Sequence, residues 1–569
     1  MPQTETVQIV IDSLLAAGVK YVFGVPGAKI DSVFNALLDR PEIRLVVCRH
    51  EQNAAFIAGA VGKITGRPGV CIVTSGPGTS NLVTGLVTAN DEGMPVVAIA
   101  GDVKRAQAFK RTHQSLRVSE LLSPVTKKVV SVIVPDQVGE LMLDAFRTAT
   151  TYPQGATAIS LPIDIMTAGV TSEVPAFQPS AFQPPKYGYS PVESLRKAAE
   201  LIEAAKFPVL FLGARASSPV QVQAVHALLR KFPIPVVETF QAAGAISKEL
   251  VHLFYGRVGL FRNQPGDKIL GRADLVITVG YDQAEYDADR WNPKNRFDIL
   301  HLDFTPADIA HNYNPKLELI GSPAANLKAL TDLLETVAKP QDTPQAKSIL
   351  AEMHSWETAA CGTNPSGPVQ PLHFIRLLQS KIDSASASDT GNPPTTVCCD
   401  VGSVYIYFSR YFYSYSPKTF LVSNAQQTLG VALPWAIAAS LTQDPPCSRK
   451  VVSVSGDGGF LFTGQELATA VKEGCDITHF VWNDGKYNMV EFQEVDKYGR
   501  SAGIELGGVD FAKYAEAFGA LGLKVRSEAE LEGVMERALA HKGVCVVDVE
   551  IDYSRNHELM MHVIADDIL

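Results

Sequence analysis

One pattern recurs along this chain: a short run of apolar residues, then a glycine-rich or polar turn, then an amphipathic stretch. Continuous apolar runs bounded by turns are typical of strands that are buried on both faces of a parallel sheet. Such runs occupy residues 43–49, 208–213, 273–280, 299–303, 397–401, 450–455 and 477–482. The pattern predicts an α/β protein built from doubly wound parallel sheets.

Two proline-rich breaks divide this pattern. Residues 175–191 contain five prolines, and residues 339–371 mix proline, glycine and polar residues around a short helix. We therefore expect three domains, at residues 1–172, 193–338 and 372–569, joined by linkers at 173–192 and 339–371. The middle domain lacks the full glycine fingerprint of a dinucleotide site, so NAD binding there is the weaker alternative.

Composition narrows the class of protein. The chain has 569 residues, of which 46% are hydrophobic, and a net charge of −10, which argues against nucleic-acid binding. The apolar stretch at residues 428–441 contains Pro434 and is too short to span a bilayer. Neither a secretory signal nor a transit peptide is visible near the N-terminus, so we expect a cytoplasmic protein without membrane contacts.

The strongest candidate chemistry follows the apolar run at residues 450–455. Its turn contains Gly456, Asp457, Gly458 and Gly459, and Asn483 and Asp484 end the next predicted strand. Thr463 and Glu466 have the spacing of a helix capping box between the two strands. Open α/β sheets bind ligands at the carboxyl ends of their strands, and carboxylate oxygens suit Mg²⁺. We predict a magnesium-diphosphate site; the alternative is an ordinary turn with a solvated aspartate.

A second candidate, Glu51, opens a predicted helix directly after the strand at residues 43–49. Its residue type and place alone favour an ordinary glutamate that the helix dipole stabilises. Together with the loops at residues 23–27, 74–81 and 426–434, however, these motifs resemble the thiamine-diphosphate enzymes of the acetohydroxyacid synthase and pyruvate oxidase group. The match runs nearly end to end and is closest to the catabolic, flavin-independent acetolactate synthases. The resemblance implies thiamine diphosphate and Mg²⁺ as cofactors.

The resemblance also assigns roles to residues. Glu51 would hydrogen-bond N1′ of the cofactor's aminopyrimidine, and Asp457, Asp484 and the carbonyl of Lys486 would bind the metal. The family has asparagine where Asp484 stands, so the site carries an extra negative charge. Further cofactor contacts are implied for Pro26, Gly27, Pro77, Asn81, Val401, Gly402, Ser403, Gln427, Leu429, Gly456, Gly458, Gly459, Tyr487, Asn488 and Met489. Of these, Gln427 would accept from the 4′-amino group, and Leu429 replaces the usual methionine wedge.

Three departures from related enzymes select the reaction. Pyruvate decarboxylases have an aspartate and a His-His pair as proton donors where this chain has Ala28 and His113-Gln114, which favours carbon–carbon bond formation over aldehyde release. Asp282 stands in the turn where the anabolic synthases hold FAD, so FAD is not expected. Gln493 replaces the tryptophan that favours 2-ketobutyrate, so pyruvate is the expected acceptor.

The resemblance thus implies an acetolactate synthase, which decarboxylates one pyruvate and joins the hydroxyethyl unit to a second, giving 2-acetolactate and CO₂. Glu51, Gln114, Lys29 and Gln493 are the expected catalytic residues, although Lys29 could equally be a solvated side chain. In this family Glu51 of one subunit meets the diphosphate site of another, so a homodimer or homotetramer is expected. The alternatives are a pyruvate oxidase-like or other 2-ketoacid decarboxylase, and a non-catalytic homologue of the same fold.

Overall fold

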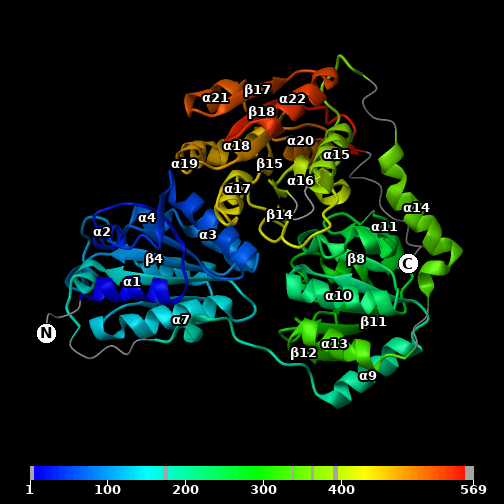
Figure 1. Ribbon diagram of the computed structural model, residues 1–569, viewed down its shortest axis with the longest axis horizontal. Helices are drawn as coiled ribbons and strands as arrows, with labels where there is room; N and C mark the ends of the chain where they lie inside the picture. Colours follow the sequence, from blue (N-terminus) through cyan, green and yellow to red (C-terminus); the bar gives the residue numbers. More distant parts are fainter. Residues whose placement is uncertain are drawn as a thin grey trace.

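The computed structural model describes residues 5–170, 177–262, 264–335, 339–359, 364–388 and 395–557. The strands in these ranges form three six-stranded sheets, and every strand pairing in them is parallel. Helices pack beside each sheet (Figure 1). The prediction of three doubly wound parallel sheets is confirmed. The exact domain boundaries stay a prediction.

The first and third sheets have the same strand order. The first runs β2-β1-β3-β4-β6-β5 and the third β14-β13-β15-β16-β18-β17. The first sheet is built from β1 (Tyr21–Val25), β2 (Arg44–Val47), β3 (Gly69–Val73), β4 (Val96–Asp102), β5 (Lys128–Ser131) and β6 (Ala156–Pro162). The third is built from β13 (Thr396–Cys399), β14 (Phe420–Val422), β15 (Val451–Gly456), β16 (Ile477–Asn483), β17 (Leu521–Val525) and β18 (Cys545–Glu550).

The helices of these two domains alternate with their strands. Around the first sheet they include α1 (Thr6–Ala16), α2 (Asp31–Leu37), α3 (Glu51–Thr65), α4 (Pro77–Ser80), α5 (Val83–Asp91) and α7 (Val138–Thr150). Around the third they include α15 (Pro371–Ser388), α16 (Ser403–Tyr411), α17 (Ala432–Leu441), α18 (Asp457–Thr463), α19 (Leu467–Lys472), α20 (Asn488–Tyr498), α21 (Phe511–Ala517) and α22 (Glu528–Ala540). Helix α3 packs against α17, and one apolar core contains Phe56, Trp435 and Phe460 from both domains.

The middle sheet has the order β12-β11-β10-β7-β8-β9. From β7 the chain first adds β8 and β9 on one side, and then adds β10, β11 and β12 on the other side. Its strands are β7 (Pro208–Leu212), β8 (Val236–Thr239), β9 (Phe254–Val258), β10 (Leu275–Val279), β11 (Asp298–Asp303) and β12 (Leu317–Ile320). Its helices include α9 (Val192–Ala204), α10 (Pro219–Lys231), α11 (Pro265–Leu270) and α13 (Pro323–Leu333), and α14 (Pro344–Thr358) follows. No helix in the described ranges is long and apolar enough to cross a membrane.

The helix between β15 and β16 begins earlier than the sequence predicts. Helix α18 already starts at Asp457, and a 3-10 turn separates it from α19. The predicted capping box is wrong, because both of its side chains make tertiary contacts instead. The Thr463 hydroxyl donates to the Gly430 carbonyl at 2.7 Å, and the Glu466 carboxylate accepts from the backbone N–H of Arg49 at 2.8 Å.

Candidate active site

The candidate residues lie after strands that flank the point where each outer sheet reverses its strand order. That point is between β1 and β3 in the first sheet and between β13 and β15 in the third. Open parallel sheets bind ligands outside the carboxyl ends of strands at such a point. In the third sheet Val401 follows β13, Asp457 follows β15 and Asp484 follows β16. The fold therefore brings the C-terminal candidates to one edge.

The pair Asp457 and Asp484 has the electrostatics of a cation site. Burial and the neighbouring Asp484 raise the pKa of Asp457 to about 6, and burial raises the pKa of Asp484 to about 6. Two negative charges this close together repel each other. A divalent cation bound between the carboxylates would relieve this repulsion. Within the described residues no group of three or more His, Cys, Asp or Glu side chains could hold a metal. A metal ion held by this pair would take a further ligand of another kind, such as a backbone carbonyl oxygen.

The Lys486 amine forms an ion pair with Glu491 at 2.8 Å. The backbone nearby is held in place by Asp457. Its Oδ2 accepts from the N–H of Gly485 at 2.7 Å, and its Oδ1 accepts from the N–H of Gly458 at 2.8 Å. This arrangement fixes the turn after β16 relative to the turn after β15, and it fits a hard cation bound by oxygen atoms.

Two helix N-termini meet beside the aspartates. Ser403 begins α16 and Asn488 begins α20, and the Ser403 hydroxyl donates to Asn488 Oδ1 at 2.7 Å. Helix N-termini present unpaired N–H groups and attract anions. A Cβ added at Gly402, where φ is +117°, or at Gly456 would meet nothing within 4 Å, so open space borders both backbones. The arrangement fits a diphosphate bound next to a metal ion.

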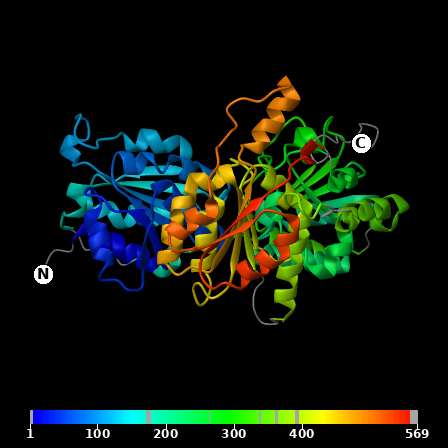
Figure 2. The ribbon, with the colours of Figure 1, turned by 90° about the horizontal axis from the view of Figure 1, so that it is seen from above.

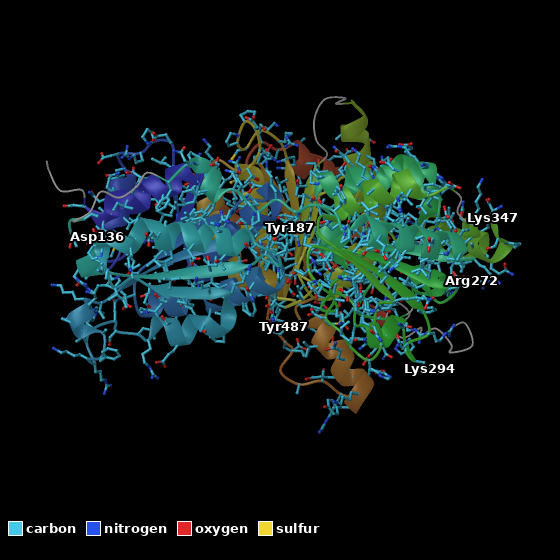
Figure 3. All side chains as sticks on the ribbon, turned by 90° about the horizontal axis from the view of Figure 1, so that it is seen from below. Asp136, Tyr187, Arg272, Lys294, Lys347 and Tyr487 are labelled. Atoms are coloured by element: carbon cyan, nitrogen blue, oxygen red, sulfur yellow. The ribbon has the colours of Figure 1, made fainter. Side chains whose placement is uncertain are left out.

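The other glycines of the turn are needed for packing. A Cβ at Gly458 would lie 2.5 Å from the ring of Tyr487, and a Cβ at Gly459 would lie 3.0 Å from the carboxyl carbon of Asp400. Figure 3 labels Tyr487 where α20 leaves the body of the molecule, and Figure 2 shows this helix projecting outwards. Met489 packs at the edge of the third-domain core.

The segment that follows β18 reaches this site. The Asn556 amide donates to Ser403 Oγ at 3.1 Å and to Asn488 Oδ1 at 2.6 Å, and Asn488 donates in turn to Asp484 Oδ2 at 2.8 Å. Asn556 is only 4% exposed, and its own Oδ1 has no partner among the described residues. Tyr553 is half-buried nearby, and desolvation and then the charge of Asp484 raise its pKa well above the usual range. The rest of the tail, 558–569, lies outside the described residues.

Gln427 and Leu429 lie in the loop after β14. Gln427 adopts a left-handed φ of 47°, which non-glycine residues rarely do, and Leu429 is half-buried beside it. A buried carboxylate that the motifs did not reveal, Asp400, accepts from the N–H of Gly430 at 2.8 Å. Burial raises the pKa of Asp400 to about 6. No local signal distinguishes this aspartate from any other residue at a strand end.

The N-terminal candidates form a second group. Glu51 is 8% exposed and its Oε2 accepts from the Asn81 amide at 2.9 Å. Asn81 caps the C-terminus of α4, whose first residue is Pro77. A Cβ added at Gly78 would lie 3.4 Å from Oε1 of Glu51, so that oxygen faces the same turn. The loop after β3 and the start of α3 therefore meet around one carboxylate.

Two more loops complete this group. Gln114, with a φ of 60°, lies against the loop after β3, because a Cβ at Gly76 would be 3.0 Å from its Cβ. The loop after β1 is bound to the same region through the Lys29 N–H, which donates to Thr74 Oγ1 at 3.3 Å. Gly27 also packs on Thr74, whereas Pro26 is exposed and the Lys29 side chain is half-exposed.

In the part of the chain that the structure describes, no side-chain hydrogen bond joins the candidates of these two groups. Among the described residues, the Glu51 carboxylate bonds to Asn81 and to none of the C-terminal candidates. Gln493 is exposed on α20 and touches neither group through a hydrogen bond in the described structure. Near the C-terminal group, Leu461 and Phe462 of α18 are 39% and 47% exposed.

In the middle sheet an ion-pair cluster lies at the carboxyl ends of the strands, the edge at which open parallel sheets bind ligands. Arg215 follows β7, and its guanidinium bonds Asp303 at 2.6 Å and Asp282 at 2.7 Å, as well as the Tyr281 carbonyl at 2.7 Å. Asp282, which the sequence analysis singled out as unfavourable to a flavin diphosphate, is therefore paired with Arg215.

Comparison with known proteins agrees with this architecture. Three family models of the thiamine pyrophosphate enzymes match this chain; thiamine pyrophosphate is another name for thiamine diphosphate. The model of the N-terminal binding domain matches residues 4–121, that of the central domain residues 195–330, and that of the C-terminal binding domain residues 400–549. The chain is 45% identical to the acetolactate synthase of Bacillus subtilis (strain 168), over 97% of this chain and 94% of the relative. It is 43% identical to the catabolic acetolactate synthase of Raoultella terrigena, over 99% and 97%. The chain belongs to the thiamine pyrophosphate enzyme family.

Proposed function

We propose that this protein is an acetolactate synthase that uses thiamine diphosphate and Mg²⁺ to convert two pyruvate molecules into 2-acetolactate and CO₂. The observation that carries the proposal is the pair of groups at the sheet edges: a buried glutamate held by Asn81, and open space at Gly402 and Gly456 beside the crowded Asp457 and Asp484. Both closely related acetolactate synthases extend over nearly the whole chain. The proposed catalytic and binding residues are those assigned above.

When bound, thiamine diphosphate supplies the electron sink for decarboxylation. The protein contributes position and protons. Because Oε2 of Glu51 is bonded to Asn81, Oε1 is the oxygen left to hold the pyrimidine. Ser403, Asn488 and the turn glycines would hold the diphosphate, while Gln114 and Lys29 would face pyruvate. With glutamine in place of a proton-donating histidine at 114, protonation to an aldehyde is disfavoured.

We also propose that the enzyme works without FAD. At the ligand-binding edge of the middle sheet, the Arg215 guanidinium is already bonded to two carboxylates and one carbonyl. Most of its N–H groups are therefore engaged, and the neighbouring carboxylates Asp282 and Asp303 would repel a flavin diphosphate. Addition of FAD to the purified protein should leave the rate of acetolactate formation unchanged.

The active unit is proposed to be a cytoplasmic homodimer or homotetramer whose sites lie between subunits. Its support is that, among the described residues, the Glu51 carboxylate bonds to none of the C-terminal candidates, and that Leu461 and Phe462 of α18 are exposed. The seven described cysteines are all unpaired, as is usual in a reducing compartment.

Mixed subunits test this arrangement. Glu51→Gln and Asp457→Ala subunits should each be inactive alone. A hybrid dimer would keep one intact site, with about half of the wild-type activity, because the two changes fall in the same site. If each site were built within one chain, the hybrid would stay inactive.

The activity itself is tested by incubating the purified protein with pyruvate, Mg²⁺ and thiamine diphosphate, without FAD. Acetolactate, measured after its conversion to acetoin by acid, is the expected product. Aldehyde as the main product would indicate a simple decarboxylase, and acetyl phosphate or a requirement for FAD would indicate an oxidase. No turnover together with no cofactor binding would indicate a non-catalytic homologue.

A further inference from the structure

A buried carboxylate of the first domain holds the loop that carries Gln427. Glu92 caps the C-terminus of α5 and is 5% exposed. Its Oε1 accepts hydrogen bonds from three successive backbone N–H groups, those of Asn424 at 2.9 Å, Ala425 at 3.0 Å and Gln426 at 3.4 Å. The Ser423 hydroxyl donates to the same oxygen at 2.7 Å. One oxygen of the first domain thus binds the backbone up to the residue before Gln427.

The far end of the same loop is held by a carboxylate of the third domain. Asp400 accepts from the N–H of Gly430 at 2.8 Å and from that of Ala432 at 3.3 Å. Between the two anchored ends lies Gln427 with its left-handed φ of 47°. Residues in sparsely populated backbone conformations persist only where the surroundings impose them, and they gather at functional sites. The surroundings here are two carboxylates from different domains.

Glu92 is also connected to the helix that begins with Glu51. Its Oε2 accepts from the amide of Gln241 in the middle domain, and Gln241 Oε1 accepts from the Lys63 ammonium at 3.0 Å. Lys63 lies in the last turn of α3. Burial raises the pKa of Glu92, and the nearby charge of Lys63 opposes that rise. All three domains therefore meet at this one carboxylate.

We propose that Glu92 is a positioning residue for the cofactor, which sets the backbone conformation at Gln427 by accepting the N–H groups of residues 424–426. The inference rests on the proposed function, because the Gln427 carbonyl and Leu429 are the groups assigned to the cofactor's pyrimidine side. Removal of the carboxylate would leave three backbone N–H groups, including that of the buried Asn424, without their acceptor, and the loop would relax away from its left-handed turn. Cofactor affinity should therefore depend on a residue that does not touch the cofactor.

The test measures binding of thiamine diphosphate with Mg²⁺ to the full-length apoprotein by titration calorimetry. Glu92→Ala should weaken binding by about tenfold or more, since it leaves several hydrogen bonds unmade. Glu92→Gln keeps an acceptor oxygen for the loop and should stay within about threefold of wild type. The matched control is Asp91→Ala, which removes an exposed carboxylate that accepts from the side chains of Gln426 and Asn90 and from no backbone N–H of the loop in the described structure.

Ser423→Ala gives an independent reading if Glu92→Ala does not fold, and it should weaken binding by about threefold because one donor is lost. The inference is overturned if Glu92→Ala, or Ser423→Ala in its place, binds as wild type does. It is also overturned if Glu92→Gln or Asp91→Ala weakens cofactor binding as much as Glu92→Ala does. If the wild-type protein binds no thiamine diphosphate, the proposed function is overturned. If the wild type binds the cofactor and all variants bind it equally well, only this inference is overturned.

Discussion

The Asn81 amide and the Glu51 carboxylate are joined by a hydrogen bond of 2.9 Å at a site where the glutamate is only 8% exposed. The bond occupies one carboxylate oxygen and turns the other towards Gly78 at the end of the first sheet. A carboxylate that is buried, oriented and left with one free oxygen is suited to exchange a proton with a bound ligand.

Glu51→Gln should abolish most of the activity without abolishing cofactor binding. The amide has nearly the same shape but cannot carry a proton between two partners, so we expect acetolactate formation to fall by about 10² to 10⁴. Initial rates and calorimetric titration of thiamine diphosphate would measure the two properties. Glu120→Gln changes a carboxylate of the same domain that is 64% exposed, and it should keep full activity. Retained activity in Glu51→Gln would remove Glu51 from the mechanism.

Asp484→Asn should weaken the metal site. The substitution removes one of two crowded carboxylates, so Mg²⁺ affinity should fall by about tenfold or more. Titration of Mg²⁺ into apoprotein that contains saturating thiamine diphosphate would measure this. Glu505→Gln, at a 74% exposed residue that lies 3.7 Å from the Lys486 amine, makes the same charge change beside the site and should have little effect. Equal affinities in wild type and Asp484→Asn would show that the negative charge of Asp484 does not strengthen metal binding.

Asn556→Ala should lower cofactor affinity, because its amide bonds both Ser403 and Asn488. Outer partners of metal and ligand groups commonly contribute about tenfold or more to affinity. Calorimetric titration of the apoprotein with thiamine diphosphate and Mg²⁺ would show the change. Ser554→Ala, two residues earlier and exposed, is the control. If both variants bind like wild type, the tail is an ordinary docked terminus.

His479 should make the fold sensitive to acid. Its ring is fully buried between Ser453 and Ser455, at 2.7 Å and 2.8 Å, and burial lowers its pKa from 6.5 to about 3. Between these values the unfolded chain binds a proton that the folded chain does not, so stability falls as pH decreases from 6.5 towards 3, by up to about 1.4 kcal/mol per pH unit.

Thermal unfolding at pH 7 and pH 5 tests this. The decrease in Tm between the two should be smaller in His479→Gln than in wild type, because glutamine binds no proton. His252→Gln, at an exposed histidine, should keep the wild-type decrease. An identical decrease in His479→Gln would show that other groups cause the acid sensitivity.

Much of the fold, and the position of the glycine turn at Asp457, could be predicted from the sequence, because the signals are local. Buried parallel strands produce continuous apolar runs, and a glycine turn directly after such a run marks the strand end at which Asp457 stands. The grouping of the strands into three parallel sheets follows from the repeated unit of a strand, a turn and a helix. The capping box failed for the opposite reason: Thr463 and Glu466 bond to groups that are distant in sequence.

The residues that hold the loops could not be predicted from local patterns. Ser423 and Glu92 are 331 positions apart, and Asn556 and Ser403 are 153 positions apart. A buried carboxylate or amide without a neighbouring motif has the same sequence signature as a solvated one, so only its partners in the folded chain reveal its role.

The ratio of CO₂ released to 2-acetolactate formed tests the proposed reaction most directly. Wild-type protein with pyruvate, Mg²⁺ and thiamine diphosphate, and without flavin, should release equal amounts of the two while consuming two pyruvate molecules for each acetolactate. A large excess of CO₂ over acetolactate, with acetaldehyde or acetyl phosphate making up the difference, would contradict carbon–carbon bond formation as the main reaction of this enzyme.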